Sequence, residues 1–436
     1  MTTRTGSNIV SLSEWQTCQI EGMALGPEDG ALLKSLTGGT DTRLGLDELR
    51  AGLRITSRSW VGVVRFKDFE LRIVPKLAGG DIGLLRMVDF ATGLDAVDRH
   101  PAVHTFAAEG ASLLDLITLL LTEACERIIR AGMLADYQEL EDDLPVVRGR
   151  LLVREQVLRR MGRVDRVVCR YDEHTTDTID NRLLLAALSV AGSRVTHPDV
   201  ALRVRRLHGV LADACSVDDL DLRMARSTLT YNRLNEHYQE AHQLAWLVLE
   251  GLGIEDLYAG GSHRTFAFLL DMNRLFEDFV TRWLAALLRG THYRSIAQRR
   301  DRTILWNADL NRPYAKVIPD LVVERKDKPG RFLPLDAKYK LYEERRISPA
   351  DIYQTFMYAY AYGQTHAVLP SAVIIYPAQT DTAQVQRLHV RRADGLPSAQ
   401  IVGIGIDVLA ALDEAFAMQP GNIGSRLLQQ IGTALD

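Results

Sequence analysis

The chain has 436 residues, of which 47% are hydrophobic and 25% are charged, and its formal net charge is −4. One hydrophobic core supports roughly 250 to 300 residues, so we expect two or three domains. The composition is that of a soluble globular protein and excludes disordered, fibrous and membrane classes. Because the charge balance is slightly acidic, any contact with nucleic acid must come from local basic patches.

Neither the N-terminal stretch nor the apolar runs of the sequence predict export or membrane insertion. The N-terminal stretch MTTRTGSNIVSLSEW lacks the apolar core of a signal peptide. The most apolar run, residues 113–121, is interrupted by Asp115 and is shorter than the roughly 18 residues that span a bilayer. We therefore expect a cytoplasmic protein without membrane contacts. Reduced thiols are expected for the widely spaced cysteines, none of which forms a CxxC pair: Cys18, Cys125, Cys169 and Cys215.

The first part of the chain combines strands with helices. Residues 60–77, WVGVVRFKDFELRIVPKL, alternate β-branched or aromatic residues with polar ones around Lys67-Asp68, which predicts a β-hairpin. Residues 81–95 and 111–140 then show helical spacing. The expected apolar stripe of the second helix is Leu113, Leu116, Ile117, Leu120, Leu121 and Ala124.

Residues 145–170 carry the densest basic patch of the chain. Only Glu155 and Asp165 accompany its arginines, which are Arg148, Arg150, Arg154, Arg159, Arg160, Arg163, Arg166 and Arg170. One interpretation is a solvated face that pairs with the acidic stretch 139–143, because charge runs are usually exposed surface. The other is contact with phosphates or with an acidic partner.

Residues 177–250 have helical spacing throughout, with a break at His197-Pro198-Asp199. The glycine-rich AGGSHR at 259–264 is the best domain boundary. The sequence thus predicts a mixed α/β protein in three parts. These are a β-rich N-terminal domain for partner docking over 1–110, a mainly helical, arginine-rich region over 111–258, and a catalytic domain over 259–436.

The residues that can carry chemistry lie between Val317 and Lys340. Two strand-like runs, VIPDLVVE and RFLPLDAKYK, flank the turn residues KDKPG, which predicts an antiparallel hairpin. Asp320 and Asp336 are expected on the two strands, where pairing can bring them side by side. Lys338 follows Asp336 by two positions and so points to the same face.

This combination suits phosphodiester hydrolysis. Carboxylate oxygens of Asp320 and Asp336 are the hard ligands that Mg²⁺ prefers, and Mn²⁺ could replace it. The ammonium group of Lys338 would position water and stabilise negative charge. The PD…DxK pattern is that of PD-(D/E)XK nucleases and predicts a restriction-endonuclease-like C-terminal domain.

Two flanking helices offer further candidates. Glu277 lies in the helical MNRLFEDFV and is either a third metal ligand or an exposed helix glutamate. After an N-cap-like Ser348-Pro349 start, Gln354 and Tyr358 are four residues apart and share one face, from which Gln354 could reach the scissile phosphate. The other aromatic residues of this helix are expected to pack, together with Met357: Tyr353, Phe356 and Tyr360.

Competing chemistries lack their motifs. The sequence contains no GxxxxGK[ST] loop for nucleoside triphosphates, and neither HExxH nor GxSxG. His263 stands beside a glycine pair near the candidate domain, but a loop histidine is more often incidental.

Together these stretches resemble the McrC family, the nuclease subunits of McrBC-type modification-dependent restriction systems. The resemblance spans roughly residues 50 to 380 and also rests on ITSRSWVGVVRF, LPVVRGRLLV and CRYDEHTTDTIDNRLLLAAL. It implies a C-terminal domain that cleaves DNA and an N-terminal part that docks into a hexameric McrB-like AAA+ GTPase ring and stimulates GTP hydrolysis. It also implies catalytic roles for Asp320, Asp336 and Lys338, with Glu277 and Gln354 at flanking positions.

Three hypotheses remain open from the sequence. The first is a Mg²⁺-dependent DNA endonuclease subunit of a GTP-driven complex. The second is a non-catalytic assembly factor that activates an AAA+ ring through a nuclease-like fold, and the third is a freestanding nuclease. Metal binding by Asp320 and Asp336 separates the first from the second, and cleavage without a partner identifies the third.

Overall fold

The structure is a computed structural model. It describes the whole chain except residues 1–3, 6–8, 39–41, 77–78, 95–96, 98–99, 162, 164, 219, 253–264, 329, 341, 343–345, 364–368, 380–383 and 436. Helices and strands both contribute substantially, which confirms the mixed α/β class. In the described residues, no helix is both long and apolar enough to cross a membrane. All four cysteines fall within the described part, where they are buried free thiols.

The chain divides into two compact units. Unit 1 contains Met1–Ala108 and Arg264–Asp436, and unit 2 contains Glu109–His263. The three-part division drawn from the sequence differs from this arrangement, because the first and last segments share one unit. The reason is strand β11 (Phe266–Asp271), which pairs antiparallel with β6 (Trp60–Arg65). His263 and the boundary expected at 259–264 lie outside the described residues.

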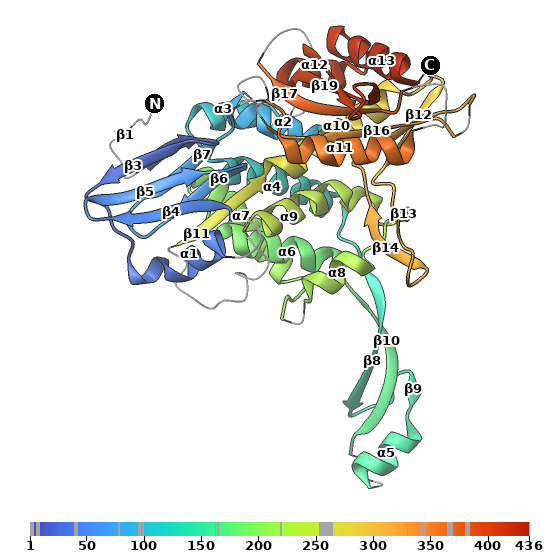
Figure 1. Cartoon of the computed structure of the whole chain (residues 1–436). Helices are drawn as coiled ribbons and strands as arrows, with labels where there is room; N and C mark the ends of the chain where they lie inside the picture. The colour runs from blue at the N-terminus through green and yellow to red at the C-terminus, as the bar shows by residue number, and fades with distance from the viewer. Residues whose placement is uncertain are drawn as a thin grey trace. The chain divides into compact units, whose positions relative to one another are not determined.

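A five-stranded sheet in the order β1-β2-β7-β6-β11 forms the first part of unit 1 (Figure 1). The predicted hairpin over 60–77 is confirmed: β6 pairs antiparallel with β7 (Glu70–Val74), and Phe66 N donates to Phe69 O at 2.9 Å. The helix expected over 81–95 corresponds to α2 (Gly80–Thr92). The other elements here are β1 (Arg4–Thr5), β2 (Ile9–Ser13), α1 (Gly30–Thr37), α3 (Ala102–Ala108) and a second sheet of β3 (Thr17–Glu21), β5 (Gly52–Ser57) and β4 (Leu44–Leu49).

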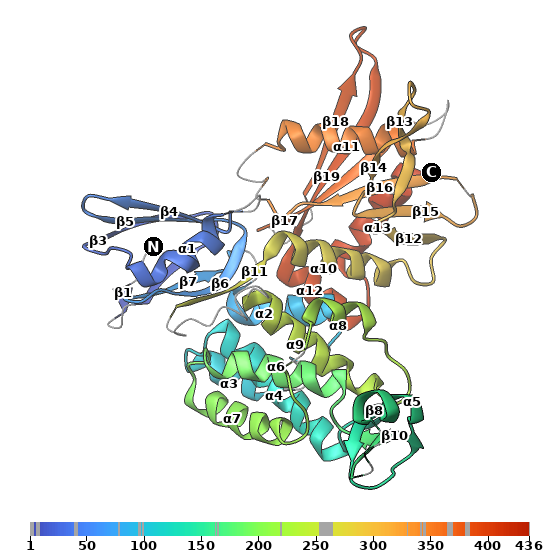
Figure 2. The same ribbon diagram turned by 90° about the horizontal axis from the view of Figure 1, so that it is seen from below.

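A six-stranded sheet in the order β12-β15-β16-β17-β19-β18 forms the second part of unit 1 (Figure 2). Every residue of β17 (Ser371–Ala378) is buried, so both faces of the sheet are covered at its centre. Helix α11 (Pro349–Tyr362) packs on one face, where Ala359 clusters with Ala372 and Ala399 and Phe356 packs against this cluster. The remaining elements are α10 (Met272–Leu287), β12 (Tyr293–Ala297), β15 (Leu321–Arg325), β16 (Phe332–Ala337), β18 (Gln384–Arg391), β19 (Pro397–Asp407), α12 (Val408–Ala417) and α13 (Asn422–Leu435).

A separate two-stranded hairpin projects from this sheet (Figure 1). It consists of β13 (Asp301–Asn307) and β14 (Arg312–Val317), which pair antiparallel. The sequence run VIPDLVVE is therefore not one strand: Val317 ends β14 and Leu321 begins β15. Pro319 explains the break, because proline has no N–H to donate to a sheet.

A buried carboxyl group joins the two parts of unit 1. Glu14, which follows β2, is 1% exposed and accepts hydrogen bonds from Lys76 N at 2.9 Å and from the Tyr339 hydroxyl at 2.8 Å. Burial is the main cause that raises the pKa of Glu14 from 4.5 to about 7. Since Tyr339 lies between Lys338 and Lys340, Glu14 supports the strand end that carries the candidate lysine.

This contact predicts a pH dependence of stability. Between pH 4.5 and 7 the folded chain keeps the Glu14 proton that the unfolded chain has lost, so the free energy of unfolding falls as pH rises through this window. The total effect is up to about 3 kcal/mol. Glu14→Gln should remove this contribution, so the fall in the urea midpoint between the two ends of the window should be smaller in the variant than in wild type. Glu28→Gln, at a half-exposed side chain, is the matched control; equal pH dependence in Glu14→Gln and wild type would contradict the assignment.

Unit 2 is a helical bundle that carries a β arm (Figure 1). Helix α4 (Leu113–Ala131) buries all six positions of the predicted apolar stripe. However, the helix expected over 111–140 is wrong beyond Ala131, since residues 136–144 form β8 (Asp136–Leu144). This acidic, largely exposed strand has no apolar alternation, and its partner β10 (Val167–Thr175) comes from a distant segment. The helices expected over 177–250 are confirmed as α6 (Ile179–Gly192), α7 (Pro198–Ala212), α8 (Leu222–Thr228) and α9 (Gln239–Leu252).

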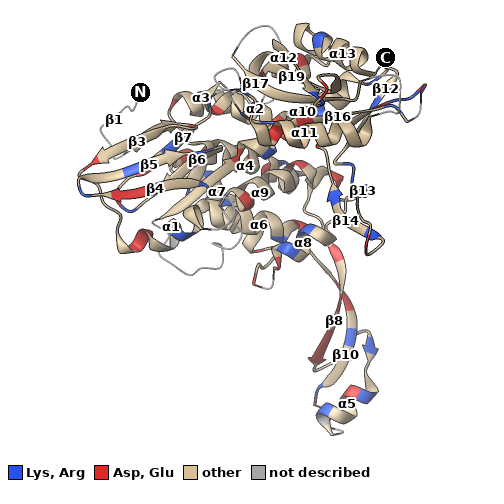
Figure 3. Ribbon diagram, viewed as in Figure 1, with Lys and Arg blue, Asp and Glu red and all other residues tan. Residues whose placement is uncertain are grey.

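The arm consists of β8, β9 (Arg150–Leu151), α5 (Val153–Arg160) and β10. Some of its arginines pair with the acidic stretch: Arg170 bonds Glu141 and lies 3.5 Å from Glu139, and Arg166 donates to Asp143 O at 2.7 Å. Figure 3 shows acidic positions on β8 and basic positions on β10 of the same arm. The solvated-face interpretation therefore holds for these arginines. The end of the arm also exposes large apolar side chains: Val146, Val147, Val153, Val157, Leu158 and Met161.

Candidate active site

The two candidate aspartates meet where β15 and β16 pair. Leu321 pairs with Leu335 in the antiparallel ladder, so Asp320 and Asp336 follow one step beyond this pair. Asp320 lies in the break just before β15, not on a strand as expected, and its Oδ2 accepts a hydrogen bond from Ala337 N at 2.8 Å. Asp336 lies inside the sheet, between β15 and β17, and is 1% exposed.

Lys338 follows directly after β16. Its backbone N donates to Ile375 O at 2.8 Å, which extends the pairing with β17 and fixes the side chain's direction. Lys338 Nζ lies 2.8 Å from Asp336 Oδ2, as the expected common face requires. Asp336 Oδ1 accepts no hydrogen bond from any residue that the structure describes. A buried carboxylate oxygen without a donor is rare in proteins and leaves a place for a cation.

Electrostatics at the cluster favour a bound cation. Burial, followed by the charges of Asp336 and Glu277, raises the pKa of Asp320 from 3.8 to about 8. Burial alone would lower the pKa of Lys338, but the charge of Asp336 and the hydrogen bond to it outweigh burial and raise that pKa. The lysine is therefore fully charged at neutral pH, whereas Asp320 holds a proton that a metal ion could displace.

Glu277 lies at the edge of the cluster on α10. The apolar face predicted for this helix is confirmed, with Phe276, Phe279 and Trp283 buried. Burial raises the pKa of Glu277, with smaller contributions from the charges of Asp278 and Asp336. In the described part of the chain, no three acidic, histidine or cysteine side chains converge closely enough to hold a metal together. The cluster thus provides two carboxylates as candidate metal ligands, those of Asp320 and Asp336, and Glu277 lies near them.

Gln298 is a residue that sequence reasoning missed. Its backbone N donates to Asp320 O at 2.9 Å, and its side-chain amide donates to Glu277 Oε1 at 3.3 Å. Its φ angle is 44°, in the left-handed region that non-glycine residues rarely adopt and that is common at functional sites. No motif marks this position, because both of its partners come from other elements.

Gln354 and Tyr358 share one face of α11, as predicted. The Gln354 amide donates to the Tyr358 hydroxyl at 2.9 Å, and that hydroxyl donates to Ile318 O at 3.1 Å. Burial, and then the charges of Asp336 and Asp320, raise the pKa of Tyr358, which places this hydroxyl within electrostatic range of the aspartates. Gln354 itself is exposed at the rim. The packing expected for Tyr353 and Tyr360 is wrong, since both are 72% exposed.

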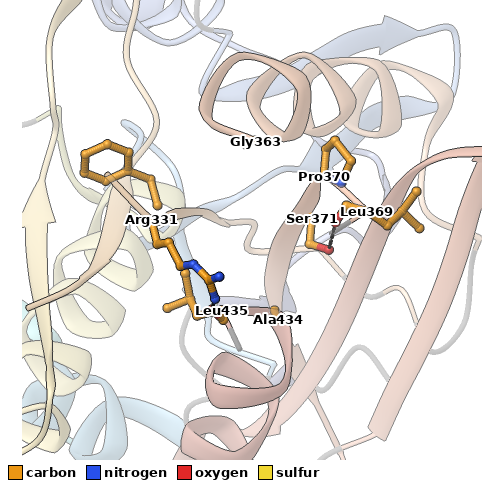
Figure 4. Close-up of a pocket in the computed structure, with 8 residues that line it drawn as sticks. Arg331, Gly363, Leu369, Pro370, Ser371, Ala434 and Leu435 are labelled. Atoms are coloured by element: carbon orange, nitrogen blue, oxygen red, sulfur yellow. Dashed lines mark hydrogen bonds between the residues drawn. The ribbon is translucent and has the colours of Figure 1, made fainter. Parts of the chain in front are cut away.

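Two cavities of unit 1 lie away from this cluster. One, of about 30 Å³, is lined by residues of β16, β17 and the end of α13, where Arg331 Nη1 donates to Leu435 O at 2.9 Å (Figure 4). This volume suits one water molecule. Another, of about 600 Å³, lies between α2, α10 and α12. None of the catalytic candidates lines either cavity.

Among curated proteins, none matches the chain. A structure described as a refined half-complex from a tetradecameric assembly of Thermococcus gammatolerans McrB AAA+ hexamers with bound McrC aligns with a TM-score of 0.57 and 18% identity, covering 94% of this chain and 99% of that one. A cryo-EM structure of the Thermococcus gammatolerans McrBC complex aligns with a TM-score of 0.46 and 21% identity, covering 64% and 88%. At these identities, the first alignment shows a shared fold.

The family model gives the assignment. The model described as "McrBC 5-methylcytosine restriction system component" matches residues 55–377, which is well over half of the chain. These residues include both β6–β7 and the whole cluster of Asp320, Asp336 and Lys338. The chain therefore belongs to the McrBC 5-methylcytosine restriction system component family.

Proposed function

We propose that this chain is the Mg²⁺-dependent DNA endonuclease subunit of a GTP-driven McrBC-type restriction complex. The observation that carries the proposal is the buried Asp336–Lys338 ion pair beside Asp320, whose pKa is raised to about 8. Paired carboxylates with an adjacent lysine are what metal-assisted phosphodiester hydrolysis needs. Membership of the family supports the restriction role.

The residues present fit a divalent metal ion. Asp336 Oδ1 lacks a donor in the described chain, and burial, followed by the charges of Asp336 and Glu277, raises the pKa of Asp320 to about 8. Mg²⁺ is usually held by one or two carboxylates and keeps several waters, so Asp320 and Asp336 would suffice, and Mn²⁺ would bind similarly. Such an ion would polarise the phosphate and lower the pKa of a bound water. Glu277, hydrogen-bonded by Gln298, would act from the edge of the site.

The side chains of the protein contribute charge and orientation. Lys338, held 2.8 Å from Asp336, presents a fixed ammonium group that stabilises negative charge developing on the phosphate. Tyr358 holds the Gln354 amide at the rim, where it can donate a hydrogen bond to the DNA strand. Neither group needs to reorganise during the reaction, and this preorganisation is what makes electrostatic stabilisation effective.

We also propose that the arm of unit 2 is the part that docks into a McrB-like AAA+ ring and stimulates GTP hydrolysis. A McrB hexamer with bound McrC is the assembly described for the structure of shared fold. Exposed apolar clusters on soluble proteins mark interaction surfaces, and Leu158 and Met161 near the arm's end are 68% and 92% exposed. In residues 1–110, where docking was expected from the sequence, Trp15 is the one large apolar side chain that is exposed among the described residues.

The raised pKa of Asp320 gives a direct test of the metal site. Below pH 8 the metal must displace the Asp320 proton, so Mn²⁺ affinity should rise about tenfold per pH unit up to about pH 8 and then level off. Titration calorimetry in two buffers of different ionisation enthalpy should show about one proton released per Mn²⁺ at pH 7. Binding without proton release would contradict the shared role of Asp320 and Asp336, and absence of Mn²⁺ binding would favour the non-catalytic assembly factor.

A further inference from the structure

The β13–β14 hairpin is rooted at the catalytic cluster. Gln298, three residues before β13, bonds both Glu277 and the Asp320 carbonyl. The other strand, β14, ends at Val317, three residues before Asp320. The start of β13 and the end of β14 therefore both lie within a few residues of groups that form the candidate metal site. A molecule bound by the hairpin is held beside that site.

Helix α11 fixes the base of the hairpin. The Tyr362 hydroxyl donates to Asp301 at the start of β13, and the Tyr358 hydroxyl donates to Ile318 O just after β14. The two tyrosines are one helical turn apart, so one helix holds both strands. Arg299 adds an ion pair to Asp301 at 3.0 Å and lies over the ring of Phe332 at 4.5 Å. The hairpin thus has a fixed base on the same helix that carries Gln354.

Strand β14 combines two cations with an aromatic ring. Arg312, Tyr314 and Lys316 lie within five residues of β14, and all three are exposed. The pairing with β13 is irregular at Tyr314, which lies between the Trp306–Pro313 and Leu305–Ala315 pairs. Tyr314 is 74% exposed. Neither Arg312 nor Lys316 forms an ion pair with any residue that the structure describes. At about 3.3 Å per residue the Cα atoms of Arg312 and Lys316 are at most roughly 13 Å apart, which corresponds to about four base-pair steps along the axis of a DNA duplex.

The local charge is opposite to that of the whole chain. Residues 298–317 contain five basic residues and two acidic ones, although the net charge of the protein is −4. One of the acidic residues, Asp301, is already engaged by Tyr362 and Arg299. Figure 3 shows the basic positions on the hairpin. The hairpin therefore carries an excess of positive charge next to the acidic metal site. Such a surface is complementary to a phosphate backbone, and the hairpin itself would repel a cationic ligand.

From these observations we infer that the β14 face, defined as Arg312, Tyr314 and Lys316, binds the DNA backbone next to the scissile bond. This inference rests on the proposed nuclease function and names the surface that presents the substrate. Arg312 and Lys316 would each contact a phosphate, and the Tyr314 ring would lie against the sugar or a base between them. Because β14 leads to Asp320 through only Ile318 and Pro319, the bound strand is positioned at the metal site.

Binding without cleavage tests the β14 face separately from the chemistry. The full-length chain is titrated with a fluorescein-labelled DNA duplex in EDTA, and anisotropy is followed over a range of NaCl concentrations. Arg312→Ala/Lys316→Ala should weaken binding about tenfold and reduce the slope of log K against log[NaCl] by up to about two, since each lost phosphate contact removes nearly one unit. Tyr314→Phe should bind like wild type, whereas Tyr314→Ala should bind several-fold more weakly.

A matched control is available on another exposed strand. Arg387 and Arg391 alternate with His389 on β18, so Arg387→Ala/Arg391→Ala removes the same charge from a similar strand face and should leave binding unchanged. Equal loss in both double variants, or no binding by wild type at low salt, would overturn the inference. The inference would also be overturned if Arg312→Ala/Lys316→Ala bound DNA like wild type but no longer co-purified with the AAA+ ring. An acidic protein surface would then be the partner of these side chains. Because binding is measured in EDTA, these outcomes do not depend on catalysis. Absence of Mg²⁺-dependent cleavage by the wild-type complex would contradict the nuclease proposal alone.

Discussion

Lys338→Ala should lower the rate of DNA cleavage by a Mg²⁺-loaded complex by about 10² to 10³-fold, while GTP hydrolysis by the same complex stays at its wild-type rate. The lysine is the one ammonium group paired with Asp336, and loss of a single preorganised charge at a reacting centre costs this much. Asp336→Asn should abolish cleavage, since it removes half of the carboxylate set. Cleavage of modified DNA and GTP turnover are measured on the same preparations.

Lys328→Ala is the matched control for this experiment. Lys328 is an exposed lysine at the turn of the same β15–β16 hairpin, remote from the paired aspartates, and its loss should leave both activities intact. Loss of cleavage and GTP hydrolysis together in Lys338→Ala would argue that the lysine supports assembly and not chemistry. Unchanged cleavage in Asp336→Asn would remove the basis of the proposed site.

Leu158→Ser/Met161→Ser should disrupt the complex with the AAA+ ring. Both side chains are largely exposed in the free chain, so their apolar area becomes buried only if the arm docks. Burial of two such side chains is worth several kcal/mol, and their replacement should weaken the complex by about a hundredfold or more. Size-exclusion chromatography of the mixed proteins and the stimulation of GTP hydrolysis are the measurements.

The control for the arm lies on the helical bundle of the same unit. Leu202 on α7 and Met224 on α8 are 63% and 62% exposed, so Leu202→Ser/Met224→Ser removes comparable apolar surface away from the arm. This variant should assemble normally. If the arm variant assembles and stimulates GTP hydrolysis as wild type does, docking must use another surface, and residues 1–110 become the next candidate.

Local patterns were sufficient to predict the catalytic strand pair. The alternation in residues 60–77 and the turn residues at 326–330 each specify a hairpin within one short segment, and both hairpins are confirmed. The two-residue spacing of Asp336 and Lys338 also led to a contact that the structure has. These predictions succeeded because strand periodicity and turn chemistry are properties of neighbouring residues.

Long-range pairing could not be predicted in the same way. The acidic strand β8 follows a helix, carries no apolar alternation and pairs with a segment beyond the arginine-rich stretch, so its local pattern favoured helix. The union of residues 1–108 with the catalytic part depends on β11 joining β6. The contact of Gln298 with Glu277 likewise depends on where α10 packs. Such contacts arise from tertiary structure, which overrides local propensity.

The exposed aromatic residues illustrate a further limit. Helical spacing alone suggested that Tyr353 and Tyr360 pack, yet both lie on the outer face of α11, while Phe356 and Ala359 face the sheet. The sequence of this helix is apolar on more than one face, so periodicity cannot identify the buried side. The pairing of β13 with β14 was not predicted for a related reason. Strand β14 is exposed at nearly every position and lacks the alternation of a half-buried strand.

The position of Mn²⁺ in crystals grown with the metal, located by its anomalous scattering, tests the central claim most directly. The proposed site predicts one ion bound by a carboxylate oxygen from each of Asp320 and Asp336, at about the 2.0 to 2.2 Å typical of small divalent ions. The same crystals of Asp336→Asn should lack this ion. An ion held by other residues, or none between these two carboxylates at saturating Mn²⁺, would contradict the assignment of this chain as a metal-dependent nuclease.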